Sequence, residues 1–189
     1  LSTVAAAATL ALTAASAPLG SPTKFLRVDG AEFSPQEHWE LLDTVQEIGV
    51  SVHINDLVAC NDSGASGLYF TGRKELHVCQ DNRNGGSEEQ VEWTANDFDT
   101  IRHEVHHIVQ DLQDGRLGDR RLHPVFVNQQ QFEALLAEAL TQEQIDGISR
   151  HYGGRGLDDR GVRMELEAFA VAQLIPPAQL EQALINLSR

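Results

Sequence analysis

The sequence predicts an α+β domain in which short strands lie in the N-terminal half and helices fill most of the C-terminal half. Short apolar or alternating runs between residues 50 and 79 are bounded by Gly, Ser and Asn, which is typical of strands joined by tight turns. From residue 94 onward, cap residues and stop signals bound segments whose apolar residues recur with helical spacing. A chain of 189 residues suggests one domain, large enough to bury a core.

The first 23 residues carry no charged side chain. Val4 to Ala15 is an apolar run about as long as the central region of a signal peptide, and Ala15-Ser16-Ala17 fits a small-x-small cleavage site. The run is too short to span a bilayer as a helix. We therefore interpret 1–23 as a signal-like or flexible segment and place a single folded domain at 24–189.

The domain is expected to open with a strand, a helix and a second strand. Residues 24–28 favour a short strand. Ser34 followed by Pro35 places a cap residue before a proline, which predicts a helix over 35–48. The apolar run at 50–54 then predicts the second strand.

A β-hairpin is predicted next, with strands at 67–70 and 75–79 joined by a turn at 71–74. Cys60 and Cys79 flank this Gly-rich region. In an exported protein they would form one disulfide, and a buried pair of free thiols is the alternative. An exposed hairpin strand of this kind can hold an extended peptide through main-chain hydrogen bonds.

Helices are expected to make up the rest of the chain. Thr94 or Asn96 caps the first of them and Gly115 ends it, after which residues 115–127 form an irregular connection. The remaining helices are predicted at 129–140, 142–152, 159–175 and 178–187.

The first of these helices carries the pattern His-Glu-x-x-His as His103, Glu104 and His107. Residues four apart share one face of a helix, so the two imidazoles can bind one cation. Zinc accepts such nitrogens and keeps one position for water when the site is catalytic. Glu104 can take a proton from that water. The alternative is an exposed helix that happens to carry histidines.

A helical projection supports the metal-binding interpretation. His103, Glu104 and His107 lie nearly opposite an apolar stripe, which predicts the floor of a cleft. His106 lies away from that row and is expected to be solvated, or to support a ligand, rather than to bind the metal itself. The stripe consists of Phe98, Ile101, Val105, Ile108, Val109 and Leu112.

A third protein ligand is needed, because two histidines alone hold zinc poorly. Glu165 projects into an apolar arc without a basic partner, whereas Glu167 lies on the side of Arg163 and is interpreted as half of a surface ion pair. A carboxylate in an apolar arc is costly unless something positive meets it, so Glu165 is preferred over Glu167. His123, His151 and Asp158 are further candidates for the third ligand.

The pattern His103-Glu104-x-x-His107 followed by Glu165-x-x-Ala168 resembles the zincin metallopeptidases of the glutamate-ligand branch, the gluzincins. The resemblance covers the two helices that carry these motifs, a minority of the chain. It implies a zincin-like fold, in which a small mixed sheet with a hairpin lies over an active-site helix and a mostly helical part follows. It also implies that Glu165 is the third zinc ligand.

The chain departs from the gluzincin pattern at one position. Several gluzincins have Asp or Asn directly after the Ala of the second motif, where it holds a zinc-bound histidine. This chain has Phe169 there, so the contacts that support its ligands must differ. Asp111 and Asp114 occupy the region where a metzincin would continue with glycine and a third histidine, which argues against that class.

The predicted activity is hydrolysis of peptide bonds with Zn²⁺ as cofactor, in which His103, His107 and Glu165 bind the ion and Glu104 is the general base. Two rival functions are a non-catalytic zinc-binding domain and a zinc hydrolase of a non-peptide substrate. A further donor should stabilise the oxyanion. The candidates for it are Tyr152, His151, Arg155 and His123.

Charge and export signals restrict the partners and the compartment. The formal net charge of −14 argues against nucleic acid or an anionic membrane surface as the main partner. The expected partner is a peptide or protein substrate, with no stable membrane insertion. The signal-like start and the possible Cys60–Cys79 disulfide predict a secreted or otherwise extracytoplasmic location.

Overall fold

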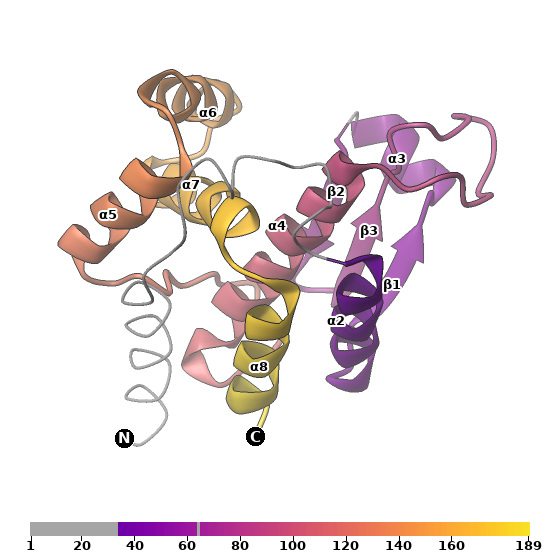
Figure 1. Ribbon diagram of the computed structural model, residues 1–189, viewed down its shortest axis with the longest axis horizontal. Helices are drawn as coiled ribbons and strands as arrows, with labels where there is room; N and C mark the ends of the chain where they lie inside the picture. Colours follow the sequence, from indigo (N-terminus) through magenta and orange to yellow (C-terminus); the bar gives the residue numbers. More distant parts are fainter. Residues whose placement is uncertain (1–33, 64) are drawn as a thin grey trace.

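The computed structural model describes residues 34–63 and 65–189. The signal-like segment 1–23 and the predicted strand 24–28 lie outside the described residues. Over the described ranges the protein has a mixed α/β fold with a small three-stranded sheet and mostly helical content (Figure 1). The elements are α2 (Pro35–Glu47), β1 (Ser51–Ile54), α3 (Leu57–Ser63), β2 (Gly67–Phe70), β3 (Glu75–Val78), α4 (Ala95–Asp111), the 3₁₀ turn η2 (Leu112–Asp114), α5 (Gln129–Ala139), α6 (Gln142–Gly154), α7 (Asp159–Leu174) and α8 (Pro177–Leu187).

The sheet is mixed, with strand order β1-β3-β2. β1 runs parallel to β3, whereas β2 pairs antiparallel with β3 across the predicted hairpin turn. The central strand β3 buries Leu76 and Val78 completely. β2 lies at an edge, where its only partner among the described strands is β3, and it also contacts α4. A strand edge therefore lies beside the helix that carries the His-Glu-x-x-His motif.

Thr94, rather than the alternative Asn96, is the N-cap of α4. The hydroxyl of Thr94 accepts a hydrogen bond from the backbone N–H of Asp97, and the Asp97 carboxylate accepts one from the backbone N–H of Thr94. After Asp111 the helix tightens into η2, and Gly115 ends it with a φ of 79°. Residues next to the helix in the sequence thus determine where it begins and where it ends.

The core forms around α4. The predicted apolar stripe of this helix is buried along its whole length, with Ile101, Val105 and Ile108 fully inaccessible. α4 contacts β2 and β3 as well as α7 and α8, so it lies between the sheet and the C-terminal helices (Figure 1). The predicted C-terminal helices are confirmed to within one or two residues at each end.

The short helix α3 lies between the predicted strand at 50–54 and the predicted hairpin, in a Gly-, Ser- and Asn-rich region where the sequence indicated no helix. The carboxylate of Asp56 accepts a hydrogen bond from the N–H of Ala59 (2.7 Å), and its carbonyl accepts one from the N–H of Cys60 (2.9 Å). A helix of seven residues is too short to show a helical period in sequence. Asp56, the acceptor that caps α3, is a typical helix-start residue, but the Gly-, Ser- and Asn-rich composition of the segment favoured a loop.

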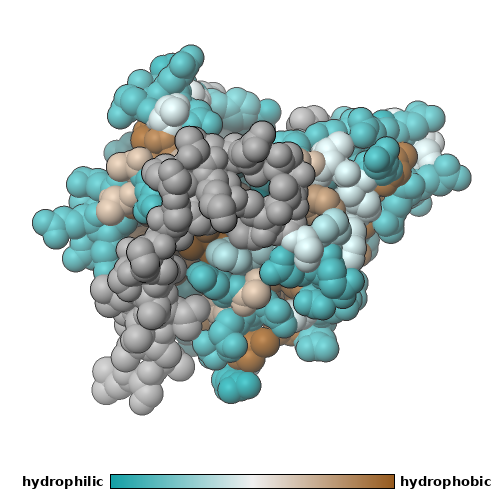
Figure 2. All heavy atoms as spheres, viewed as in Figure 1, coloured by the Kyte–Doolittle hydropathy of each residue, from teal (hydrophilic) through white to brown (hydrophobic). Residues whose placement is uncertain are grey.

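Cys60 and Cys79 form the predicted disulfide, which ties α3 to the residue after β3. A disulfide is compatible with an extracytoplasmic location. Within the described ranges, no helix is both long and apolar enough to cross a bilayer. Hydrophilic residues cover most of the described surface visible in Figure 2, and apolar residues show only in small separate areas.

Replacing both cysteines by serine is expected to lower the free energy of unfolding by about 3 kcal/mol, because the bridge closes a loop across a sequence separation of 19 residues in the unfolded chain. The melting temperature should fall by about 6–12 °C. Denaturant unfolding under oxidising conditions measures the loss. Wild-type protein treated with a reductant should match the variant, and equal midpoints for oxidised wild type and variant would contradict the prediction.

Candidate metal centre

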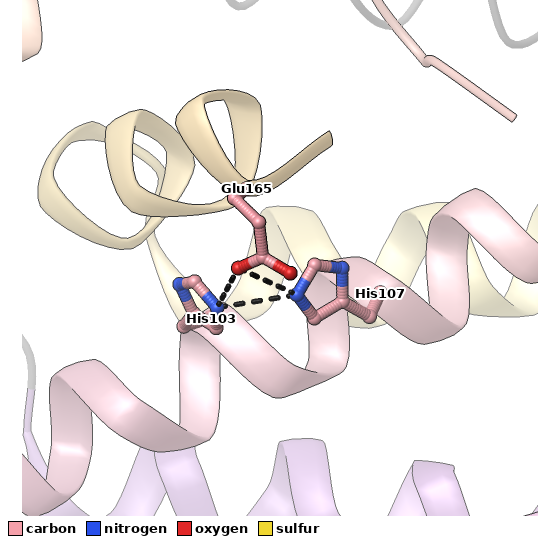
Figure 3. Close-up of side chains that lie close together, drawn as sticks. All are labelled: His103, His107 and Glu165. Carbon is pink, nitrogen blue, oxygen red and sulfur yellow. Dashed lines mark hydrogen bonds and ion pairs between the residues drawn. The ribbon is translucent and has the colours of Figure 1, made fainter. Parts of the chain in front are cut away.

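Two imidazoles of α4 meet on one face of the helix. His103 and His107 project side by side from α4 (Figure 3), and their Nε2 atoms lie 3.2 Å apart. Both side chains are nearly buried. The spacing of four residues therefore places the two nitrogens together, as the sequence predicts.

Glu165 joins them from α7. Its carboxylate points down onto the two imidazoles (Figure 3), with Oε2 lying 3.4 Å from His103 Nε2 and 3.6 Å from His107 Nε2. The preferred third ligand and the two histidines thus converge from helices far apart in sequence. In the described part of the chain, this is the one group of three or more His, Cys, Asp or Glu side chains whose ligand atoms lie close enough together to hold a metal ion.

The separations fit the geometry of a tetrahedral zinc site. Zinc lies about 2.0–2.2 Å from nitrogen and oxygen ligands, so two ligand atoms at neighbouring corners are about 3.4 Å apart. The three separations in the cluster, 3.2, 3.4 and 3.6 Å, bracket that value. Two imidazoles and one carboxylate are three ligands, so a tetrahedral metal ion held by them would keep a fourth position for water.

Contacts between α4 and α7 place Glu165. The small side chains of Ala168 and Ala172 are buried and keep α7 close to α4. The buried guanidinium of Arg102 donates from Nε to the carbonyl of Ala172 (2.8 Å). Arg102 also pairs with Asp99 on its own helix, which compensates the buried charge. α7 is thereby fixed along the ligand face of α4.

The two histidines have different neighbours behind them. His107 Nδ1 lies 2.8 Å from the side-chain oxygen of Gln110. The ring of His103 packs edge-on against Phe169, with centroids 4.5 Å apart, and no described residue hydrogen-bonds its Nδ1. Phe169, which follows Ala168, thus contacts His103 through its ring and offers it no hydrogen bond.

The cluster attracts positive charge. Burial by itself would lower the pKa of His107, but the hydrogen bond to Glu165 and the charges of Glu165 and Glu104 raise it to about 9. Burial by itself would raise the pKa of Glu165, but hydrogen bonds to His103 and His107, together with their charges, hold it well below its usual value. A metal cation and protons would therefore compete for the same place.

Glu104 lies buried beside the ligands, with 6% of its surface exposed. Burial raises the pKa of Glu104, and the charges of His103 and His107 oppose that shift. The backbone N–H of Tyr69, in the edge strand β2, donates to the carboxylate. A carboxylate with a raised pKa in such a place is suited to accept a proton and to return it.

The edge strand approaches α4 most closely at Gly67. A Cβ at this position would lie 2.6 Å from Thr100 Cγ2 and 2.7 Å from Glu104 Cγ, so a side chain there would force Thr100 or Glu104 to move. Gly67 was not among the predicted site residues. A glycine inside a predicted strand is the signal that could have found it, because such glycines often mark close approach of another group.

A cleft of about 280 Å³ opens beside His103 and Glu104. Tyr152, His151 and Arg155, three of the four candidates for the oxyanion donor, line it. The fourth candidate, His123, is not among the lining residues, and its Nε2 lies 4.0 Å from the carboxylate of Asp114.

Tyr152 is the candidate donor that reaches the cluster. Its hydroxyl is hydrogen-bonded to Glu165. Burial, and then the charges of Glu165 and Glu104, raise the pKa of Tyr152. The phenol therefore stays protonated and able to donate at neutral pH.

Glu167 is not on the surface, and its interpretation as an ion pair with Arg163 is wrong. Glu167 is completely buried and hydrogen-bonds His106 Nε2 (2.9 Å). Arg163 instead donates to Gln129 and to the carbonyl of Phe126. A helical projection contains only the neighbours on the same helix, so it could not reveal partners from α4.

His106 is buried rather than solvated, with 2% of its surface exposed. Two further candidates for the third ligand also lie elsewhere: Asp158 caps α7 through a hydrogen bond to the N–H of Gly161, and His151 is exposed on α6. None of these residues joins His103 and His107 in the cluster.

Comparison with known proteins finds no match among protein-family models, curated proteins or solved structures.

Proposed function

We propose that this protein is a zinc-dependent peptidase of the gluzincin type, with a zincin-like domain spanning residues 24–189. The observation that carries the proposal is the spacing of 3.2–3.6 Å among His103 Nε2, His107 Nε2 and Glu165 Oε2, which is close to the roughly 3.4 Å between neighbouring ligand atoms of a tetrahedral zinc ion. The buried Glu104 beside them and the mixed sheet beside α4 support the same proposal.

Each residue then has a chemical role. His103, His107 and Glu165 hold the ion, which when bound supplies a Lewis acid for the carbonyl and lowers the pKa of water. Glu104 accepts the proton of the attacking water and delivers it to the leaving amine. Its buried position keeps bulk water from competing for that proton.

The substrate is an extended peptide that pairs with the edge strand β2. This strand is hydrogen-bonded to β3 on one side and lies against α4 near Glu104. Main-chain hydrogen bonds to a strand edge hold a peptide independently of its side chains. The scissile carbonyl would then lie beside the cleft at His103 and Tyr152.

Tyr152→Phe is expected to lower kcat about 10²-fold, because Tyr152 lines the cleft and we assign its hydroxyl, which can turn from Glu165 to the substrate, as the donor to the developing oxyanion. KM and zinc content should change little, because Phe retains the ring. Steady-state kinetics on one cleaved peptide measure the effect. His123→Ala, outside the cleft, serves as the control, and an unchanged kcat for Tyr152→Phe would refute the role.

The proposed activity is tested with a broad peptide library and purified protein of measured zinc content. Cleavage that a chelator abolishes and added zinc restores is the expected result. Bound zinc without cleavage of any substrate would instead favour a non-catalytic zinc-binding domain, and hydrolysis of esters or other amides alone would favour a non-peptide substrate. Absence of stoichiometric zinc would refute the metal centre itself.

A further inference from the structure

We propose that Glu167, Gln110 and His107 form a hydrogen-bonded relay in which the Gln110 amide lies between the Glu167 carboxylate and the His107 ring. The relay orients His107 and strengthens its bond to the metal. The relay rests on the metal-binding part of the proposed function and adds two positioning residues to it. It runs from Glu167 through Gln110 to His107 entirely by hydrogen bonds between buried groups.

Glu167 is the fixed end of the relay. It is completely buried, and both carboxylate oxygens accept hydrogen bonds from N–H groups that can only donate. Oε1 accepts from Gln110 Nε2 (2.9 Å) and from the backbone of Val125 (3.0 Å), and Oε2 accepts from the backbone of Phe126 (3.1 Å). His106 Nε2 lies 2.9 Å from Oε1. This set of donors stabilises a carboxylate ion without a cationic partner.

The orientation of the Gln110 amide follows from its partners. Its nitrogen lies 2.9 Å from the Glu167 carboxylate and 3.2 Å from the carbonyl of Met164, and both of these groups can only accept. The NH₂ group must therefore face them. The amide oxygen is left to face His107 Nδ1 at 2.8 Å.

This orientation determines the tautomer of His107. An amide oxygen only accepts, so His107 Nδ1 must carry a hydrogen and donate it to Gln110. In the neutral ring, Nε2 then has the lone pair, and Nε2 is the atom that faces His103 and Glu165. Once the ring gives up its second proton, the lone pair is therefore on Nε2, the nitrogen on the side of His103 and Glu165.

The buried negative charge of Glu167 also polarises the amide between them. Hydrogen bonds in series strengthen one another, so Gln110 becomes a better acceptor and His107 a more basic ligand. His103 has no such support from a described residue, since its ring packs on Phe169. The relay therefore acts on one of the two histidines.

The relay is tested by replacing Gln110. In Gln110→Met, a side chain of similar length and shape removes the amide, and zinc affinity is expected to fall about 10–100-fold. Gln110→Glu keeps an oxygen opposite His107 Nδ1 and should bind zinc more tightly than Gln110→Met. A role in packing alone predicts the reverse order, because burying a second carboxyl beside Glu167 is the more disruptive change.

Zinc affinity is measured by competition with a chelator of known affinity, and the melting temperature of the metal-free form is recorded for each variant. Gln113→Met is the matched control. Gln113 lies three residues after Gln110, and its amide donates to the carbonyl of Val109 and not to a side chain that contacts the proposed ligands. Its zinc affinity should stay within about twofold of wild type. If Gln110→Met fails to fold cooperatively, Gln110→Asn, whose shorter amide cannot reach His107, is expected to show the same loss.

The relay is overturned if Gln110→Met binds zinc as wild type does, or if Gln110→Glu binds it more weakly than Gln110→Met. These results do not depend on catalysis. If wild-type protein binds zinc but cleaves no peptide, the peptidase proposal fails and the relay can still be confirmed. If wild type cleaves peptides and Gln110→Met retains full zinc affinity, the relay alone fails.

Discussion

Glu104→Gln is expected to retain one zinc ion per chain while losing peptide hydrolysis by a factor of about 10²–10⁴ in kcat, the usual contribution of a general base. Gln has the same shape as Glu and keeps an oxygen that can accept the hydrogen bond from the backbone N–H of Tyr69. It cannot accept a proton from water. The loss should therefore appear in kcat, with metal content and melting temperature near those of wild type.

The measurement pairs single-turnover or steady-state kinetics with elemental analysis of the same samples. Glu133→Gln is the matched control. Glu133 is exposed on α5, and its carboxylate accepts a hydrogen bond from the side chain of Gln129. Full activity in Glu104→Gln would refute its assigned role. Loss of zinc together with activity would show that Glu104 supports the metal rather than the proton transfer.

Glu165→Gln is expected to lower mainly zinc affinity and Glu167→Ala mainly the stability of the metal-free protein, although a single residue separates the two positions. Glu165→Gln should weaken zinc binding about 10²–10³-fold. A zinc site with four ligands has a binding free energy of about 10–16 kcal/mol, so each ligand contributes roughly a quarter of it. The metal-free fold should lose less stability in Glu165→Gln than in Glu167→Ala, because the Glu165 side chain is 16% exposed and Gln keeps an oxygen that can accept a hydrogen bond from Tyr152.

Glu167→Ala should instead destabilise the metal-free protein by about 3–5 kcal/mol, because His106, Gln110 and two backbone N–H groups lose a buried acceptor. The melting temperature should fall by about 10 °C. Zinc titrations and thermal unfolding of metal-free samples separate the two variants. Tight zinc binding in Glu165→Gln would refute Glu165 as the third ligand.

Local sequence signals predicted most of the secondary structure of the described chain. The capping residues of α2, α4 and α6 and the turn of the hairpin act within three or four residues of the chain, so they are visible without a fold. α3 was missed because seven residues do not complete enough turns to establish a period. The antiparallel hairpin was predictable from its short turn, whereas the parallel pairing of β1 with β3 joins strands with α3 and β2 between them.

The candidate site was predictable where its residues share one helix. The spacing of His103 and His107 places their nitrogens together on any α-helix, and Glu104 follows from the same motif. Glu165 was chosen because a carboxylate in an apolar arc needs a positive partner, and that argument also depends only on its own helix. The same projection misplaced Glu167, since the groups that bury it come from α4 and from the connection before α5.

The sequence by itself therefore determined the longer helices, the hairpin, the disulfide partners and the paired imidazoles, because each depends on interactions between near neighbours or on an unambiguous choice of two cysteines. Only the tertiary structure decided that Glu165 meets the imidazoles at 3.4 and 3.6 Å, that Gly67 lets the edge strand reach Glu104, and that Glu167 lies behind His107 rather than in solvent. These contacts join α4 to β2 and α7. Their distances depend on how the elements pack, which no local pattern encodes.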